Sequence, residues 1–202
     1  MTRKRANKKS GNKKTPKKNN LKYGLILIVV LIIAAGGILA LTSSNNANKP
    51  GEDFAFYDLN GNVGHLSDYR GKVVLLDMWA TWCNPCRYQM LELRKAYQNY
   101  SHNKLEILSI NIDSKETIQD IKDFIDTYAQ YGYPLEWTFG KEKDSLDKYL
   151  KGGGIPTLCV FDQQGHLYFS KTGLTFFSKE DIPPNWTGDK TTLKEKIDEL
   201  IT

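Results

Sequence analysis

The motif Cys83-Asn84-Pro85-Cys86 follows directly after an apolar run and contains the residues best suited to chemistry. Proline is favoured in the first turn of a helix, so the motif predicts a helix that begins at Cys83, with Cys86 one turn further along. A thiolate at a helix N-terminus is stabilised by unpaired backbone N–H groups and by the helix dipole, which lowers its pKa from about 8.5. The second thiol can then resolve a mixed disulfide. The motif therefore predicts thiol–disulfide exchange.

Two cysteines at this spacing could also be half of a zinc site or form a permanent structural disulfide. Asp77, six residues before Cys83, favours the redox interpretation because it lies inside the predicted buried strand. An unpaired carboxylate there is costly, its pKa should rise, and it could accept a proton from Cys86. Alternatively, Asp77 is a hydrogen-bonded acid without a catalytic role. Trp79 and Trp82 are expected to border the turn between strand and helix.

Two apolar strands are expected to position this motif. The run Val73-Val-Leu-Leu76 predicts a strand that is buried on both faces. About seventy residues after Cys86, Ile155-Pro156-Thr157 leads into a second apolar strand. The combination of Trp-Cys-x-x-Cys with Ile-Pro-Thr resembles the thioredoxin fold, an α/β fold in which helices flank a central mixed sheet.

The segment around residues 60–75 indicates a particular branch of thioredoxin-fold proteins. Asn60-Gly61 predicts a β-hairpin near the start of the domain, since Asn-Gly favours a tight turn. The following run, Leu66-Ser-Asp-Tyr-Arg-Gly-Lys-Val-Val-Leu75, resembles the TlpA/ResA-like branch of membrane-tethered thioredoxin-fold proteins. The resemblance covers roughly residues 51–180.

This resemblance implies a role for each part of the motif. Cys83 would attack the substrate disulfide and Cys86 would resolve the intermediate, with their own disulfide as the only redox group and no cofactor or metal. Pro156 would follow a cis peptide bond, and the Ile155 backbone would pair with an extended substrate. The expected substrate-binding residues are Trp82, Asn84, Pro85, Ile155 and Pro156.

The resemblance also implies partners. TlpA/ResA-like proteins mostly reduce protein disulfides outside the cytoplasm and are recharged by a membrane or extracytoplasmic electron donor. The Asn-Pro dipeptide does not decide between reduction and oxidation. An alternative function is a copper- or other metal-binding thioredoxin-like chaperone, which would need a further ligand.

Several positions depart from related patterns. Ser109 replaces the lysine that faces the buried acid in thioredoxin, and Gln89 replaces the glutamate that ResA-like proteins have three residues after the second cysteine. Asp77, or water, would then transfer the proton.

Ala80 argues against a peroxiredoxin, and Arg87 excludes covalent haem attachment at this motif. We expect Cys159, in the strand after Pro156, to be a small buried apolar residue rather than a third redox thiol.

Charge and hydropathy divide the chain into four parts. Eleven of the 28 Lys and Arg residues precede Pro50, without any acid, and the remainder carries 17 basic and 23 acidic residues, a net charge of −6. An acidic domain argues against nucleic-acid binding. We predict a basic disordered tail (1–22), a transmembrane helix (23–41), a linker (42–50) and a thioredoxin-like domain (51–202).

The predicted transmembrane helix has 19 uncharged residues, which span about 28 Å against roughly 30 Å of bilayer core. The basic tail on its N-terminal side predicts a single-pass signal-anchor with the N-terminus in the cytoplasm and the catalytic domain outside it. A signal peptide cleaved near Ala40 or Ser44 is the alternative.

Periodicity predicts the other elements of the domain. Helices are expected at 86–100, 115–131, 145–150 and from 191, and strands at 105–111, 137–139, 157–161 and 167–171.

Overall fold

The computed structural model describes residues 51–201. The predicted tail, transmembrane helix and linker (1–50) lie outside the described residues. Within residues 51–201, no helix combines the length and the hydropathy needed to span a bilayer.

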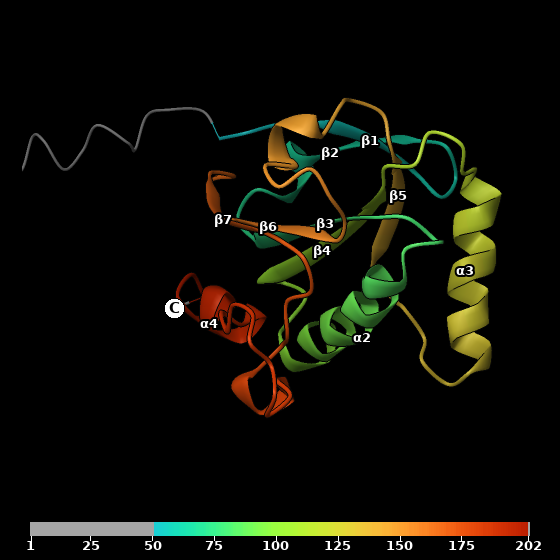
Figure 1. The fold of residues 1–202 in the computed structure, drawn as a ribbon. Coiled ribbons are helices and arrows are strands. Elements are labelled where there is room, and N and C mark those ends of the chain that lie inside the picture. Colours follow the sequence, from blue (N-terminus) through green and yellow to red (C-terminus); the bar gives the residue numbers. More distant parts are fainter. Residues whose placement is uncertain (1–50, 202) are drawn as a thin grey trace, which may run out of the picture. The chain divides into compact units, whose positions relative to one another are not determined.

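The described residues form a mixed sheet of seven strands in the order β2-β1-β5-β4-β3-β6-β7 (Figure 1). The strands are β1 (Ala55–Asp58), β2 (Val63–His65), β3 (Val73–Trp79), β4 (Leu105–Asn111), β5 (Thr138–Glu142), β6 (Thr157–Phe161) and β7 (Leu167–Thr172). β3, β4 and β5 run parallel to one another. β6 pairs antiparallel with β3 and β7, and β1 pairs antiparallel with β2 and β5. The predicted strand at residues 73–76 thus lies inside the sheet as part of β3.

Within residues 51–201, three α-helices pack on one face of the sheet (Figure 1). They are α2 (Asn84–Asn99), α3 (Ile118–Gln130) and α4 (Leu193–Asp198). α3 and α4 begin with capping boxes, in which Thr117 pairs with Asp120 and Thr192 with Glu195. Such reciprocal hydrogen bonds satisfy free N–H groups of the first turn, so they define where each helix starts.

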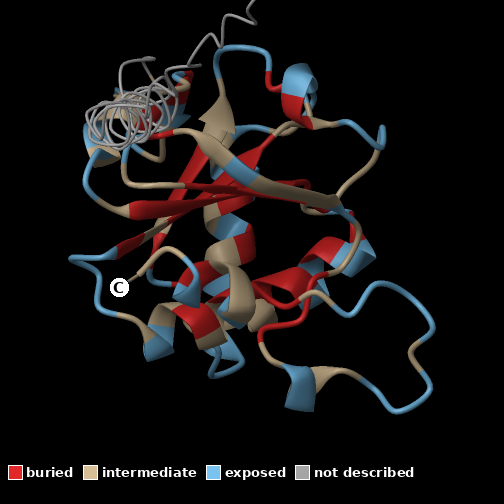
Figure 2. Ribbon diagram, turned by 90° about the vertical axis from the view of Figure 1, so that its left-hand side faces the viewer, coloured by how far each residue is buried: buried red, intermediate tan, exposed pale blue. Residues whose placement is uncertain are grey.

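Each face of the sheet has its own apolar core, because successive side chains of a buried strand alternate between the faces. Val73, Leu75 and Trp79 of β3 pack toward α2, α3 and α4. The intervening Leu76 and Met78 pack on the opposite face with Phe54 and with residues around the short 3₁₀ helices η1 (Leu66–Tyr69) and η2 (Asp147–Tyr149). Figure 2 shows buried central strands, with helices on one side of them that carry both buried and exposed residues. The α/β class with a mixed sheet and flanking helices is confirmed.

Some predicted bounds were wrong. The strand predicted at 137–139 begins at Thr138 and continues to Glu142, because β5 pairs on one side with β1 and on the other with β4. The helix predicted at 145–150 is the single 3₁₀ turn η2. A third 3₁₀ turn, η3 (Lys179–Asp181), lies in the segment after β7, for which we predicted no element.

Candidate redox site

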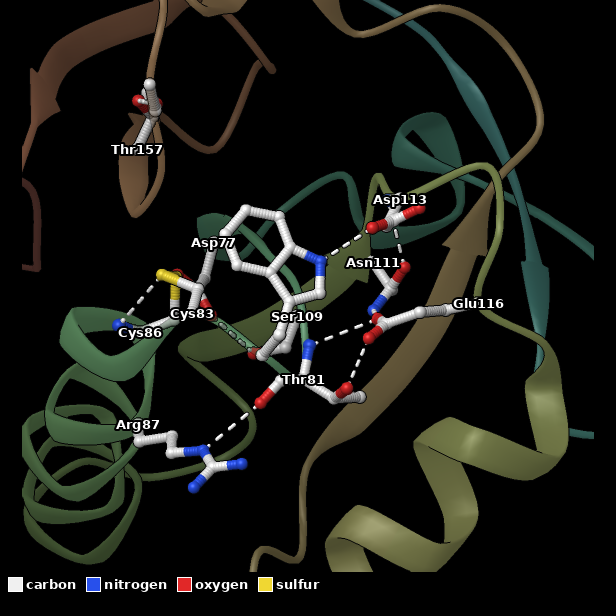
Figure 3. The surroundings of a disulfide bond; sticks show 12 residues. Asp77, Thr81, Cys83, Cys86, Arg87, Ser109, Asn111, Asp113, Glu116 and Thr157 are labelled. Atoms are coloured by element: carbon white, nitrogen blue, oxygen red, sulfur yellow. Dashed lines mark hydrogen bonds between the residues drawn. A yellow bond between two sulfur atoms is a disulfide. The ribbon is translucent and has the colours of Figure 1, made fainter.

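A disulfide joins Cys83 and Cys86 at the N-terminus of α2 (Figure 3). Cys83 is the N-cap residue, Pro85 occupies the second helical position, and the backbone N–H of Cys86 donates to Sγ of Cys83 at 3.2 Å. Cys83 is 4% exposed and Cys86 is fully buried. An incoming thiolate or disulfide can therefore reach only Cys83, and the first turn of α2 supplies an N–H donor to that sulfur.

Asp77 lies under the first turns of α2, on the same face of the sheet as the disulfide. The neighbours of Asp77 on that face of β3 are Leu75 and Trp79. Both belong to the apolar core beneath the helices, which also contains Cys83 and Cys86. Asp77 is fully buried, and its Oδ1 has no hydrogen-bond partner among the described residues. Burial raises the pKa of Asp77 to about 7, against the smaller opposite effect of a hydrogen bond from Ser109. The predicted rise in pKa is thus present.

Ser109 lies opposite Asp77 on β4, as the sequence comparison suggested. Its hydroxyl donates to Asp77 Oδ2 at 3.1 Å, and the indole N–H of Trp137 donates to the same hydroxyl oxygen at 2.9 Å. Sequence reasoning missed Trp137 because it precedes β5, 28 residues from Ser109, and resembled an ordinary strand residue.

The two tryptophans near the motif have different environments. Trp82 is 63% exposed, and its indole N–H donates to Asp113 Oδ2 at 2.6 Å. Trp79 is fully buried and packs against Phe124 and Phe139, with ring centroids 4.7 and 5.8 Å away. Both tryptophans border the turn between β3 and α2, as predicted, but only Trp82 presents a surface beside the disulfide.

An apolar groove of about 390 Å³ adjoins Trp82. It is lined by Ala80, Trp82, Ile112, Asp113, Leu150, Gly153, Gly154 and Ile155. The Ile155–Pro156 peptide bond is cis, as predicted. Within residues 51–201, the backbone N–H of Ile155 donates no hydrogen bond and its C=O accepts none. Asn84 and Pro85 are exposed next to the disulfide.

Glu116 fixes the loop between β3 and α2, and sequence reasoning did not find it. Its carboxylate accepts hydrogen bonds from the backbone N–H and the hydroxyl of Thr81 and from the side-chain amide of Asn111 (Figure 3). Arg87 donates to the Thr81 carbonyl at 3.1 Å. The polar residues that follow β4 could have pointed to this contact, since β3 and β4 are parallel and their carboxyl ends meet at one edge of the sheet.

Gln89 connects α2 to the segment that follows β7. Its amide is fully buried, donating to the Thr175 carbonyl at 3.2 Å and accepting from the Thr175 N–H at 2.8 Å. Both ends of this side chain are therefore occupied, and it has no titratable proton.

Cys159 lies on the opposite face of the sheet from the disulfide. It is fully buried, as predicted, and burial raises the pKa of its thiol to about 11.

Within residues 51–201, no three His, Cys, Asp or Glu side chains gather closely enough to hold a metal ion.

A disulfide at the start of the helix that follows β3, together with a cis-proline immediately before the neighbouring antiparallel strand β6, defines the thioredoxin-fold class of thiol–disulfide oxidoreductases. Residues 47–170 match the AhpC/TSA family. The chain belongs to this family, and it is a thiol–disulfide oxidoreductase.

Individual proteins show the same relationship. The chain is similar to the thiol-disulfide oxidoreductase ResA of Geobacillus kaustophilus (strain HTA426), at 33% identity over 131 residues that cover 64% of this chain and 70% of ResA. It is 32% identical to the thioredoxin-like protein YneN of Bacillus subtilis (strain 168) over 56% of this chain and 64% of YneN. A crystal structure from Chlorobium tepidum, assigned as a thiol:disulfide interchange protein DsbE, matches with a TM-score of 0.57 and 28% identity over 76% of this chain and 96% of that one.

Proposed function

We propose that this protein is anchored in the membrane by residues 23–41 and reduces disulfide bonds of other proteins on the extracytoplasmic side. Cys83 is the attacking cysteine and Cys86 the resolving one. The observation that carries this assignment is the asymmetry of the pair: Cys83 is the N-cap with residual exposure, whereas Cys86 is fully buried behind it.

The reaction starts from the reduced dithiol. The Cys83 thiolate attacks one sulfur of the substrate disulfide, a mixed disulfide forms, and the other substrate sulfur leaves as a thiolate that takes up a proton. Cys86 then loses its proton and attacks the Cys83 sulfur, which releases the second substrate thiol. Two electrons pass to the substrate and the Cys83–Cys86 disulfide is formed, so an external thiol donor must reduce it again.

Asp77 is the proposed proton acceptor for Cys86. It is a buried acid on the α2-facing side of the sheet, and its pKa of about 7 suits proton exchange near neutral pH. Gln89, one turn after Cys86, cannot take this role because it is an amide with both ends occupied.

The groove beside Trp82 supports a polypeptide substrate. An extended chain can pair with the N–H and C=O of Ile155, and the apolar lining of the groove can accept a large apolar side chain next to the substrate cysteine. The neighbouring exposed Asn84 and Pro85 would contact the same chain.

Membrane anchoring rests on the sequence of the N-terminal part. The uncharged stretch 23–41 has the length of a transmembrane helix, and the basic residues before it favour a cytoplasmic N-terminus. The electron donor would then be a membrane or extracytoplasmic dithiol protein.

A trapping experiment tests the order of attack. In the Cys86→Ser variant the mixed disulfide cannot be resolved, so we expect it to accumulate with a disulfide-containing protein and to be visible by non-reducing electrophoresis. Cys83→Ser is the matched control and should trap nothing. Equal trapping by both variants would contradict the assignment, and stoichiometric copper or zinc lost on Cys83→Ser would instead favour a metal-binding function.

The reduction potential of the full chain tests the direction of electron flow. We expect a value near that of thioredoxin, about −270 mV, since the protein is proposed to reduce its substrates. A value near that of the strong oxidant DsbA, about −120 mV, would assign it to disulfide formation.

A further inference from the structure

We propose that Ser109 and Trp137 are positioning residues for proton transfer: together they hold one oxygen of Asp77 in a directed hydrogen bond and leave the other oxygen free to exchange a proton with Cys86. This inference rests on the proposed proton-acceptor role of Asp77. It adds two residues, from β4 and from the segment before β5, to the machinery of the resolving step.

The direction of the hydrogen bonds follows from the donors present. An indole N–H can only donate, so the Trp137 contact at 2.9 Å occupies an acceptor site of the Ser109 oxygen. The Ser109 hydroxyl hydrogen must then point elsewhere. Its two candidate acceptors are Asp77 Oδ2 at 3.1 Å and Met90 Sδ at 4.0 Å, and the carboxyl oxygen is the closer and stronger acceptor.

This chain of hydrogen bonds distinguishes the two oxygens of Asp77. Oδ2 is occupied by Ser109, while Oδ1 has no partner among the described residues and is sealed from solvent. A buried polar atom without a partner is costly, so its presence beside a reactive disulfide calls for a functional explanation. Oδ1 is the oxygen left to carry the proton.

The groups around Asp77 supply no compensating charge. β4 presents Ser109, β6 presents the apolar Leu158, and α2 presents the disulfide cysteines and Met90. Cys83 and Cys86 are therefore the titratable groups that face Asp77 from these elements. A hydrogen bond from Ser109 stabilises the carboxylate, so in the absence of a cation Ser109 and Trp137 lower the pH at which Asp77 ionises below the value that burial alone would give.

The test follows the two steps of exchange separately in the reduced full chain, purified in detergent. Reaction with the aromatic disulfide dithiobis(nitrobenzoate) releases one thionitrobenzoate when Cys83 attacks and a second when Cys86 resolves. We expect Ser109→Ala to move the pH midpoint of the second phase upward by about one unit, because a hydrogen bond to an ionised group is lost. The first phase should not change.

Three variants complete the test. Ser109→Thr retains the hydroxyl and should restore the wild-type midpoint. Trp137→Phe retains an aromatic ring but frees the Ser109 hydroxyl to turn away, so it should shift the midpoint in the same direction by less, and it provides the test if Ser109→Ala does not fold. Asp77→Asn should make the second phase independent of pH over the same range. The infrared carbonyl band of protonated Asp77, absent from Asp77→Asn, should titrate at the same midpoints without any substrate.

The outcomes separate this inference from the function on which it rests. Suppose that Ser109→Ala and Trp137→Phe keep the wild-type midpoint while the second phase of Asp77→Asn is independent of pH. That result would overturn the role of Ser109 and Trp137 alone. An unchanged profile in Asp77→Asn would overturn the proton-acceptor role of Asp77. The absence of a second phase in the wild type would overturn the proposed exchange reaction itself.

Discussion

Asp77 and Cys83 are ionisable residues whose surroundings act in opposite directions. The N–H of Cys86 points at Cys83 Sγ and stabilises negative charge there, whereas Asp77 lies in an apolar layer that disfavours its ionised form. A thiolate near the surface and, beneath it, an acid that ionises near neutral pH suit stepwise exchange, since the first step needs a nucleophile and the second needs a carboxylate that accepts a proton.

The buried acid should reduce stability as the pH rises. The pKa of Asp77 is about 7 in the folded chain and near 3.8 when unfolded, so between these values the folded state binds the proton that the unfolded state has lost. The free energy of unfolding therefore falls as pH rises from about 4 to 7. We expect oxidised Asp77→Asn to be more stable than wild type at pH 8, by up to about 4 kcal/mol, and similar to it at pH 4.

Urea unfolding at a series of pH values measures this difference. Asp189→Asn is a suitable control because Asp189 is exposed and hydrogen bonds from Thr191 lower its pKa, so its difference from wild type should stay constant from pH 4 to 8 and change only below about pH 4. Parallel curves for wild type and Asp77→Asn from pH 4 to 8 would show that Asp77 ionises without penalty.

At the scale of elements, α2 is held to the remainder of the domain by polar contacts as well as by its apolar face. Gln89 pairs with both backbone groups of Thr175, and Glu92 accepts from the Phe177 N–H at 2.7 Å and pairs with Lys95. These side chains satisfy backbone groups of the segment after β7 that lie outside the sheet. The helix α2, whose first turn carries the disulfide, is therefore connected to a segment 86 residues away.

Removal of the Gln89 side chain should destabilise the domain. Gln89→Ala would leave the buried N–H and C=O of Thr175 without partners, at a cost of roughly 1–3 kcal/mol in the free energy of unfolding. Gln119→Ala on the exposed face of α3 is the matched control and should change it by less than about 0.5 kcal/mol. Chemical denaturation of the two variants side by side measures this, and equal effects would mean that the Gln89–Thr175 contact contributes little.

At the scale of the whole molecule, charge is distributed unevenly along the chain. All 23 acidic residues and 17 of the 28 basic ones follow Lys49, whereas the charged residues up to and including Lys49 are all basic. This asymmetry fits the proposal that a cytoplasmic tail and an extracytoplasmic domain are separated by a bilayer.

Cell fractionation tests the proposed anchor. The full chain should pellet with membranes and resist extraction at alkaline pH, and protease added to cells without an outer barrier should digest the domain but not the tail. Replacing both Val29 and Ile32 with Arg should release the protein or prevent its insertion, since each charge at the centre of a span costs about 3 kcal/mol. Leucine at both positions is the control. A soluble, shortened wild-type protein would instead support a cleaved signal peptide.

Local sequence determined the parts of the site that depend on a few neighbouring residues. The helix start at Cys83 and the buried strand before it follow from residue types and short-range patterns. The cis bond before Pro156 was predicted from the resemblance to the thioredoxin fold. The comparison with thioredoxin also placed Ser109 opposite Asp77, because strand register carries over between members of one fold.

Only the tertiary structure decided which distant residues meet at the disulfide. Glu116 holds the loop before Cys83 from 35 residues away, Trp137 directs Ser109, and Thr175 pairs with Gln89 across 86 residues. Such contacts depend on the order of strands in the sheet and on which face each helix covers, and no periodic pattern in one segment contains that information. For the same reason, the burial of Trp79 and the exposure of Trp82 became clear only once α3 and β5 were in place.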